Sequence, residues 1–297
     1  MEAGSLSLRA GRAGSHGLPL SSLPDILRLL AGAARPAQTS TSTLPLQPSA
    51  PAEKVYADNC RMSTPSPFPP KVLAFDVFGT VVDWHSGIAR EAQALRPAVD
   101  GDAFALAWRA GYQPAMQRVM SGELGWTLID DLHRLILDGI LAQFGLADLT
   151  EAQKQHLNKA WHRLDPWPDV LAGLTRLKSR HVICTLSNGN IGLLTDMAKR
   201  AALPWDCILS AEVFRAYKPD PATYLGVARV FDVAPADVML VAAHQDDLAA
   251  ARACGLQTAY IERPAEFGAA RPKDISPVPA NTRHATDLLA LADQLGC

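Results

Sequence analysis

The chain has 297 residues, a formal net charge of −2 and a pI near 6.4. This nearly neutral balance gives no electrostatic reason to expect a nucleic-acid partner. No uncharged apolar run reaches the roughly 18 residues that a membrane span needs, so we expect no membrane partner either. The five cysteines show neither disulfide nor metal-ligand spacing, which predicts reduced thiols and a cytoplasmic location.

Residues 1–65 differ in composition from the rest of the chain. They are rich in Ser, Pro, Ala and Gly and lack periodicity, so we predict a mostly disordered N-terminal extension. Met62, followed by Ser-Thr-Pro-Ser-Pro, is a candidate true start, and on that hypothesis the preceding residues are an artefact of an upstream start. The segment is also poor in acids and contains Arg9, Arg12, Arg28 and Arg35, which keeps a transit peptide as the alternative.

The first strong strand signal runs directly into a carboxylate. The apolar run Val72-Leu73-Ala74-Phe75 is followed by Asp76 and then by Val77-Phe78-Gly79-Thr80. Ligands of open α/β sheets bind in the crevice beyond the carboxyl ends of the strands. Asp76 is therefore a candidate nucleophile. The alternative is that its side chain only caps the following turn.

Between residues 84 and 165 the strand signals vanish and helical periodicity takes over. We predict helices over residues 103–120, 127–144 and 151–164. In the second, apolar residues recur at steps of three and four: Leu128, Leu132, Leu135, Ile136 and Ile140. Gly145 provides a stop, and two prolines, Pro166 and Pro168, mark the return from this segment. Residues 84–165 are thus predicted to be a helical cap that closes over the site and excludes water; the alternative is a packed insert that does not move.

After this segment, short apolar runs alternate with helix-period stretches. The apolar runs cover residues 181–186, 207–210, 238–243 and 258–261, and the helical stretches cover residues 170–180, 192–202, 221–231 and 248–254. Such alternation indicates βαβ units. We therefore predict an α/β fold with a doubly wound, mainly parallel sheet. Its core consists of residues 66–83 and 166–297, and the helical cap is inserted after the first strand.

Polar residues follow several of the predicted strands. Ser187 and Asn188 come after the second strand, Lys218 after the third and Asp247 after the fourth. Right-handed crossovers place the carboxyl ends of parallel strands at one edge of the sheet. We therefore expect these side chains to meet Asp76 at that edge.

Taken in order, these motifs resemble those of the haloacid dehalogenase superfamily, and specifically those of the type II L-2-haloacid dehalogenases. The matching pieces are Asp76-Val77-Phe78-Gly79-Thr80, Leu186-Ser187-Asn188-Gly189, Tyr217-Lys218-Pro219 with Tyr224, and Asp247. The similarity extends from about residue 71 to the C terminus. It implies a Rossmann-like core with a cap and a hydrolase that acts on carbon-halide bonds without a cofactor. It also leaves open a homodimer formed through the cap.

Phe78 separates the dehalogenases from the phosphatases of the superfamily. By resemblance, the phosphatases carry a second aspartate at this position, which protonates the leaving alcohol. Phenylalanine cannot donate a proton, and a halide leaves as a stable anion without needing one. The residue therefore favours cleavage of a carbon-halide bond; the alternative is that its ring simply packs under the cap.

The resemblance implies a mechanism in two steps. Asp76 attacks C2 of a 2-haloacid and expels the halide, and water then attacks the resulting ester and releases a 2-hydroxy acid. Lys218 is expected to keep Asp76 ionised, while Asp247 orients Lys218 and helps to position or deprotonate the water. Thr80 braces the nucleophile through its hydroxyl group. Ser187 and nearby backbone N–H groups are expected to bind the substrate carboxylate.

The halide and substrate also need binding groups, and the resemblance assigns these to Arg109, Asn188, Phe78, Trp126 and Tyr224. Arg109 matches a cap arginine that faces the leaving group, and its guanidinium offers several donors in a fixed fork. The alternative for Arg109 is a solvated position on a helix face. Trp126 aligns with an aromatic residue of the halide pocket, and its alternative is a residue of the cap core.

The fourth motif departs from the family pattern. The type II enzymes carry Ser-Ser-Asn-x-x-Asp, whereas this chain reads Ala242-Ala243-His244-Gln245-Asp246-Asp247. His244 is therefore a candidate to bond Lys218, contact the substrate or aid the hydrolytic water, and the alternative is a hydrogen-bonded support. Without a second acid near Asp76 we expect no metal. Two other hypotheses stay open: a magnesium-dependent phosphatase and a catalytically silent binding homologue.

Overall fold

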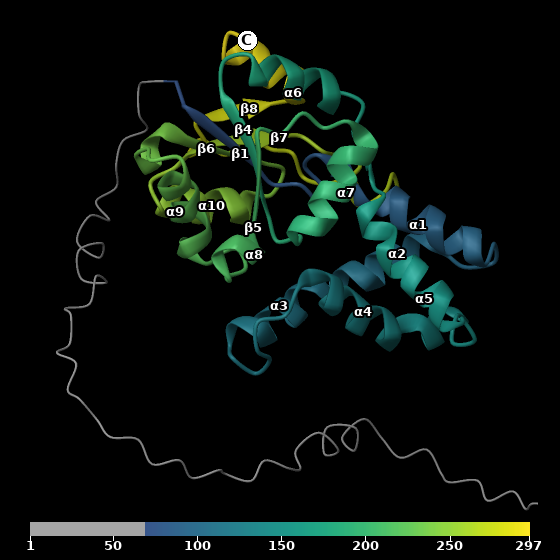
Figure 1. Cartoon of the computed structure of the whole chain (residues 1–297). Coiled ribbons are helices and arrows are strands. Elements are labelled where there is room, and N and C mark those ends of the chain that lie inside the picture. Colours follow the sequence, from purple (N-terminus) through teal and green to yellow (C-terminus); the bar gives the residue numbers. More distant parts are fainter. Residues whose placement is uncertain (1–68) are drawn as a thin grey trace, which may run out of the picture. The chain divides into compact units, whose positions relative to one another are not determined.

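The computed structural model describes residues 69–297, so the predictions for residues 1–65 and for Met62 lie outside the described residues. In the described part, six parallel strands form one sheet in the order β5-β4-β1-β6-β7-β8 (Figure 1). These strands are β1 (Val72–Phe75), β4 (Val182–Ser187), β5 (Cys207–Ser210), β6 (Val238–Ala242), β7 (Gln257–Ile261) and β8 (Arg283–Ala285).

The central strand β1 is buried on both faces. It pairs with β4 on one side and with β6 on the other, so that Val72 lies opposite both Val182 and Val238. Its alternate residues face opposite layers: Leu73 and Phe75 belong to one hydrophobic cluster, and Val72 and Ala74 belong to the other. A strand covered on both faces is expected to be apolar throughout, which explains the unbroken run before Asp76.

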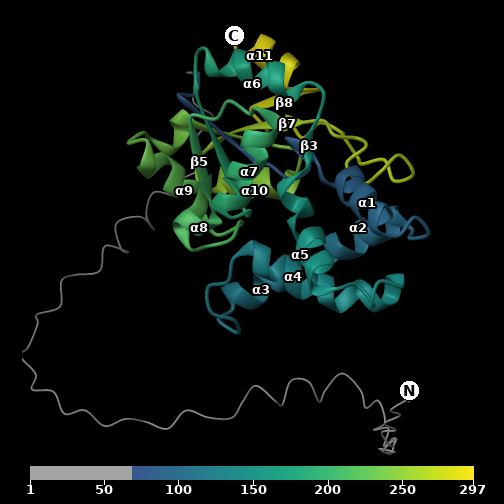
Figure 2. The same ribbon diagram turned by 45° about the vertical axis from the view of Figure 1, so that its right-hand side comes forward.

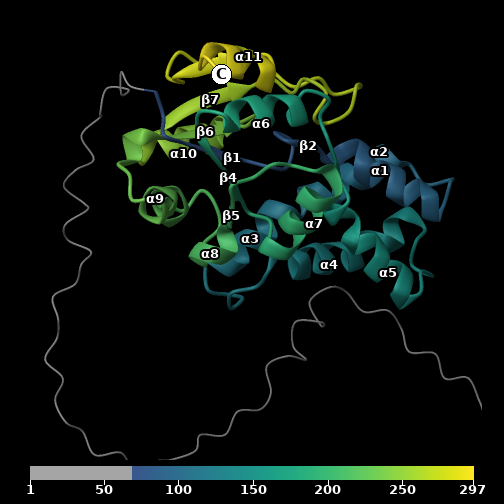
Figure 3. The same ribbon diagram turned by 45° about the horizontal axis from the view of Figure 1, so that its top comes forward.

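Helices cover the two faces of the sheet. The cluster around Leu73 includes residues of α6 (Val170–Lys178), α7 (Ile191–Ala201) and α11 (Leu288–Gln294), whereas the cluster around Val72 includes residues of α9 (Pro221–Val230) and α10 (Gln245–Ala253). Figure 3 shows α6 and α11 together on one side of the sheet and α9 and α10 on the other. The short helices α8 (Ala211–Phe214) and η6 (Pro235–Asp237) complete the connections. The predicted doubly wound α/β fold is thus confirmed.

A separate group of helices follows β1. It contains α1 (Trp84–Leu95), α2 (Gly101–Ala110), α3 (Tyr112–Met120), α4 (Ile129–Ile140), η4 (Leu141–Phe144), α5 (Glu151–Asn158) and η5 (Lys159–His162). Figures 1 and 2 show α2 to α5 gathered below the sheet. Two short antiparallel strands, β2 (Val82–Asp83) and β3 (Asp165–Pro166), pair where the chain leaves and re-enters the core. We use the name cap for residues 84–165; the division into cap and core stays a prediction.

The cap helices differ from the predicted ranges in three ways. The helix α1 was not predicted, the helices expected over residues 127–144 and 151–164 each end in a 3₁₀-helix, and the first predicted helix contains a bend. The helix expected over residues 103–120 is two helices, α2 and α3, which meet at Gly111. A Cβ atom on Gly111 would lie 2.5 Å from Cγ2 of Ile136, so glycine lets the bend approach α4 closely. Periodicity did not reveal this bend because the apolar stripe continues through it. Among the described residues, no helix is long and apolar enough to cross a bilayer.

Candidate active site

Asp76 lies one residue beyond β1, at the carboxyl edge of the sheet. Its backbone N–H donates to the carbonyl oxygen of Val241 at 3.0 Å, which continues the pairing with β6. Its side chain is buried and accepts three hydrogen bonds. Oδ1 accepts from Nζ of Lys218 at 2.9 Å, and Oδ2 accepts from Oγ1 of Thr80 at 2.8 Å and from Nδ1 of His244 at 3.0 Å. Every donor comes from a different loop at the same edge.

Thr80 belongs to the tight turn after Asp76. Its Oγ1 accepts from the backbone N–H of Ala243 at 2.8 Å, so its own proton is directed to Asp76. The turn also requires Gly79, whose φ of +85° is in the left-handed region. A Cβ atom on Gly79 would lie 2.2 Å from Oε1 of Glu266. The turn therefore lies directly against the Glu266 carboxylate.

Lys218 bridges two carboxylates. Its Nζ is 2.9 Å from Oδ1 of Asp76 and 2.5 Å from Oδ2 of Asp247. Asn188 positions the lysine, because the backbone N–H of Lys218 donates to Oδ1 of Asn188 at 2.8 Å. Asp247 lies in the first turn of α10, where the helix N terminus favours a carboxylate, and its Oδ1 accepts from the hydroxyl of Tyr224 at 2.6 Å.

These contacts set the charges of the site. Burial alone raises the pKa of Asp76, but the charges and hydrogen bonds of Lys218 and His244 outweigh it and hold that pKa far below its usual range. Burial lowers the pKa of Lys218, yet the two carboxylates raise it above its ordinary value. Burial raises the pKa of Asp247 although Lys218 opposes the shift. The nucleophile candidate is thus ionised, and the lysine beside it is charged.

His244 joins Asp76 to a second buried carboxylate. Its Nε2 is 2.7 Å from Oε1 of Glu266, while its Nδ1 contacts Asp76. Burial lowers the pKa of His244, but the charges of Glu266 and Asp76 raise it to about 9. Glu266 also accepts from Lys273 and from Nε1 of Trp84, and the opposing charges hold its pKa at about 2 despite its burial. Among the described residues, no hydrogen bond joins His244 to Lys218.

Aromatic side chains of the cap lie over the site. The ring of Phe78 is buried and meets Trp161 edge-on, with the ring centroids 5.7 Å apart. The guanidinium of Arg109 lies 4.2 Å from the ring centroid of Tyr112 and 5.8 Å from that of Trp84. Burial raises the pKa of Tyr112 to about 12; the charges of Arg109 and Lys218 are close enough to oppose this shift, and that of Asp76 adds to it. Tyr112 and Arg109 therefore face the same site from the cap.

Two predicted binding residues, Ser187 and Trp126, make contacts with groups other than Asp76. Ser187 is fully buried, and its Oγ accepts from the backbone N–H of Gly189 at 3.0 Å. Trp126 stacks on Tyr217, with ring centroids 5.0 Å apart, and lies 5.7 Å from the guanidinium of Arg215. Neither contact involves Asp76, so the substrate-binding roles of Ser187 and Trp126 stay predictions.

Sequence reasoning did not predict four side chains near the site: Glu266, Lys273, Trp84 and Tyr112. Glu266 and Lys273 follow the strand β7, so the rule of strand carboxyl ends could have marked that loop. Trp84 and Tyr112 offered no signal beyond helical periodicity. Among residues 69–297, no group of three or more His, Cys, Asp or Glu side chains is arranged to hold a metal ion.

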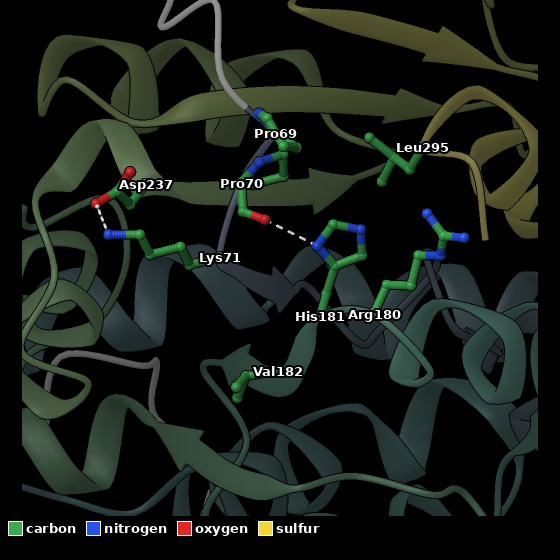
Figure 4. Close-up of a pocket in the computed structure, with 8 residues that line it drawn as sticks. All are labelled: Pro69, Pro70, Lys71, Arg180, His181, Val182, Asp237 and Leu295. Carbon is green, nitrogen blue, oxygen red and sulfur yellow. Dashed lines mark hydrogen bonds and ion pairs between the residues drawn. The ribbon is translucent and has the colours of Figure 1, made fainter.

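A separate hollow of about 700 Å³ lies where the strands begin, at the opposite edge of the sheet. Figure 4 shows His181 hydrogen-bonded to the carbonyl of Pro70 and Lys71 paired with Asp237. The residues around it are Pro69, Pro70, Lys71, Arg180, His181, Val182, Asp237 and Leu295. None of the residues around Asp76 lines this hollow, so we assign it no part in the chemistry.

Comparison with known proteins agrees with this geometry. A model of the haloacid dehalogenase-like hydrolase family matches residues 70–255. The (S)-2-haloacid dehalogenase 4A of Burkholderia cepacia is 30% identical over 199 residues, which make up 65% of this chain and 83% of that protein.

Solved structures extend the similarity to the whole described part. An L-2-haloacid dehalogenase is 46% identical with a TM-score of 0.73, and the match covers 77% of this chain and 100% of the other. A defluorinating L-2-haloacid dehalogenase is 44% identical with a TM-score of 0.74, and the match covers 78% of this chain and 100% of the other. The family model, the strand order, the contact between Asp76 and Lys218 and these relatives all agree. The chain therefore belongs to the haloacid dehalogenase-like hydrolase family.

Proposed function

We propose that the protein hydrolyses short (S)-2-haloacids to 2-hydroxy acids through an ester on Asp76, without a metal ion. The observation that carries the proposal is the buried, ionised Asp76 carboxylate held by Lys218, with the Phe78 ring two residues further on. The similarity to proteins named as L-2-haloacid dehalogenases supports the same chemistry. Water is the second substrate, and the proposed homodimer and cytoplasmic location stay predictions.

The first step uses one oxygen of Asp76. Oδ2 already accepts from Thr80 and His244, whereas Oδ1 accepts only from Lys218 among the described residues. Oδ1 therefore keeps a free lone pair for attack on C2 of the substrate. The attack forms an Oδ1–C2 bond, breaks the carbon-halide bond and inverts the carbon. The departing halide is stabilised by Arg109, whose guanidinium offers several N–H donors in a fixed fork.

The second step hydrolyses the ester. Asp247 takes a proton from the water in this proposal, which is supported by the contact of its carboxylate with Lys218, the residue that also contacts Oδ1 of Asp76. Water attacks Cγ of Asp76, and the 2-hydroxy acid departs with Oδ1. Tyr224 donates to Asp247 and keeps that carboxylate aimed at the reacting group. The cap side chains above Asp76 keep bulk water from competing with these contacts.

The phosphatase alternative requires a proton donor where Phe78 stands. Phe78 is buried, and its ring atoms lie 3.2 Å from where a Cβ atom on Gly189 would be. An apolar ring in this packed position neither protonates an alkoxide nor binds a hydrated cation. The geometry therefore favours halide over an alkoxide as the leaving group.

One assay separates the alternatives. Purified protein is mixed with 2-chloropropionate in the presence of EDTA, and with a panel of phosphate esters in the presence of magnesium. We expect halide release in the first mixture and none of comparable rate for phosphate in the second, and the Asp76→Asn variant is the control for both. Brisk phosphate release that depends on magnesium would favour the phosphatase, and the absence of halide release, of phosphate release and of an alkylated Asp76 together would favour a silent binding homologue.

A further inference from the structure

Glu266 is the most enclosed charged group near the site. Its side chain has 0% exposure, and it lies in the loop after β7. It accepts from Nε2 of His244 at 2.7 Å, from Nε1 of Trp84 at 3.2 Å and from Nζ of Lys273. Burying a carboxylate this completely is costly unless opposite charges and hydrogen-bond donors compensate for the lost hydration. Here one of the donors, His244, also reaches Asp76.

The surroundings of Glu266 hold its position from several elements. Trp84 belongs to α1 of the cap, and the Gly79 turn lies so close that a Cβ atom there would meet the carboxylate. Lys273 donates both to Glu266 and to the carbonyl of Ala243, the residue before His244. The same backbone segment donates from Ala243 N–H to Thr80. Glu266 and Lys273 therefore determine where the His244 and Thr80 donors point.

Both of those donors point to the same oxygen. Thr80 and His244 contact Oδ2 of Asp76, and Lys218 contacts Oδ1. If Oδ1 becomes the ester oxygen, Oδ2 becomes the ester carbonyl oxygen. This is the atom on which negative charge develops when water adds to Cγ, and aligned donors at such an atom are the usual means of lowering that barrier.

We propose that Glu266, supported by Lys273, is a positioning residue that holds His244 as a hydrogen-bond donor to Oδ2 of Asp76, so that His244 and Thr80 form an oxyanion hole for ester hydrolysis. The inference rests on the proposed function and assigns the second step a stabilising group. His244 and Thr80 act on the reacting atoms, and Glu266 acts through His244.

Hydrolysis of the Asp76 ester conserves atoms and charge. The water oxygen bonds to Cγ, its proton passes to Asp247, and the electron pair of the carbonyl moves onto Oδ2. When the carbonyl re-forms, the Cγ–Oδ1 bond breaks. Lys218, which touches both Oδ1 and Asp247, gives a proton to the departing alkoxide and regains one from Asp247. The products are the 2-hydroxy acid and an Asp76 that contains the oxygen of water. Asp76 returns to its carboxylate form when the second proton of that water is released to solvent.

The charges around His244 favour its role as a hydrogen-bond donor over a role as a general base. The groups that face its ring are Asp76 on one side and Glu266 on the other, with Lys273 behind Glu266 and Lys218 beyond Asp76. The pKa of His244 is raised to about 9, so the ring is already protonated at neutral pH and cannot accept a proton from water. Esterification removes the charge of Asp76, and Glu266 is then the carboxylate that keeps the imidazolium stable.

The test compares two glutamates that bond histidines in the same way. Oε1 of Glu262 is 2.7 Å from Nε2 of His284, the same separation as that between Glu266 and His244, but neither residue of that pair is among the hydrogen-bond partners of Asp76. Glu266→Gln and Glu262→Gln are each mixed with excess 2-chloropropionate, quenched at intervals, and assayed for free chloride and for the mass of the Asp76 peptide.

We expect ester hydrolysis in Glu266→Gln to slow by about 10- to 100-fold, since loss of a full oxyanion donor costs about 100- to 1000-fold and the neutral imidazole still donates weakly. Chloride should appear in a burst of about one per active site, and alkylated Asp76 should accumulate. Glu262→Gln should behave as the wild type. The defect in Glu266→Gln should deepen as the pH rises, because the unpaired imidazole loses its proton at lower pH than in the wild type.

A second pair of variants keeps the test decisive if Glu266→Gln does not fold. His244→Asn retains a donor near the Nδ1 position, and His244→Leu retains none. We expect ester accumulation in both, with hydrolysis slowed more in His244→Leu. The inference is overturned if the wild type releases halide while none of these variants accumulates ester. If the wild type itself releases no halide and forms no ester, the proposed function fails first.

Discussion

Replacing Lys218 with methionine should remove the cation shared by two buried carboxylates. In the structure its Nζ is 2.9 Å from Asp76 and 2.5 Å from Asp247. At an effective dielectric constant of about 20, each attraction is on the order of 6 kcal/mol. The cost of burying the charges offsets much of this, and removal of one partner from a buried pair typically costs about 3–5 kcal/mol. We expect Lys218→Met to lose about that much free energy of unfolding.

The loss should depend on pH. Without the lysine, Asp76 and Asp247 share a buried site, so the pKa of one of them is raised in the folded state. A carboxyl group with a raised folded pKa contributes stability that is complete below its unfolded pKa and is lost as the pH rises through the folded value. Lys218→Met should therefore be closest to the wild type near pH 4 and furthest from it at pH 8.

Urea unfolding at several pH values measures this effect, and Lys71→Met is the matched control. Lys71 pairs with Asp237 at 3.0 Å, but its side chain is 65% exposed, compared with 8% for Lys218. An exposed pair contributes about 0–1 kcal/mol, so the control should change little and show no trend with pH. Equal losses in the two variants, or a Lys218→Met loss that shrinks as the pH rises, would refute the reasoning.

Three further outcomes are expected. In a single turnover in ¹⁸O-labelled water, the label should enter Asp76 before it enters the 2-hydroxy acid, and mass spectrometry of the digested protein checks this; a labelled first product with unlabelled Asp76 would rule out the ester. Burial lowers the pKa of His244, but Glu266 and Asp76 raise it to about 9 in the folded protein. The stability that His244 contributes is therefore complete below its unfolded pKa of about 6.5 and is lost as the pH rises through 9. The melting temperature of the wild type should thus fall more steeply between pH 7 and 10 than that of Glu266→Gln, and parallel curves would contradict this. Gly79→Ala should lose at least about 1 kcal/mol in urea unfolding, because its φ of +85° and the nearby Glu266 both oppose a Cβ atom; a variant as stable as the wild type would show that the turn relaxes freely.

Residues of the cap contact groups that are assigned to each of the two proposed steps. Trp84 of α1 donates to Glu266, and Arg109 of α2 lies over Tyr112 of α3. Residues of the inserted helices thus touch both the group that positions His244 and the group proposed to receive the halide. The substitution Trp84→Phe removes the indole N–H that donates to Glu266, together with part of a buried ring. It is therefore expected to slow ester hydrolysis more than halide release.

The sequence by itself determined the fold class and the central residues of the site. The unbroken apolar run before Asp76 reflects a strand buried on both faces, and the alternation of short apolar runs with helical stretches reflects the parallel sheet. Because parallel strands end at one edge, the placement of Asp76, Asn188, Lys218 and Asp247 followed from strand order alone. These are local patterns, and each extends over only a few residues.

Only the tertiary structure decided which side chains surround that centre. Trp84 and Glu266 are 182 positions apart and yet share a hydrogen bond, and His244 and Asp76 are 168 positions apart. Such pairings depend on how a cap helix and the loop after β7 come together in space, and no periodicity records them. The bend at Gly111 was missed for the same reason, since it follows from close packing against α4. Hydrophobic pattern is a property of short segments, whereas the charge state of a buried histidine is a property of everything that packs around it.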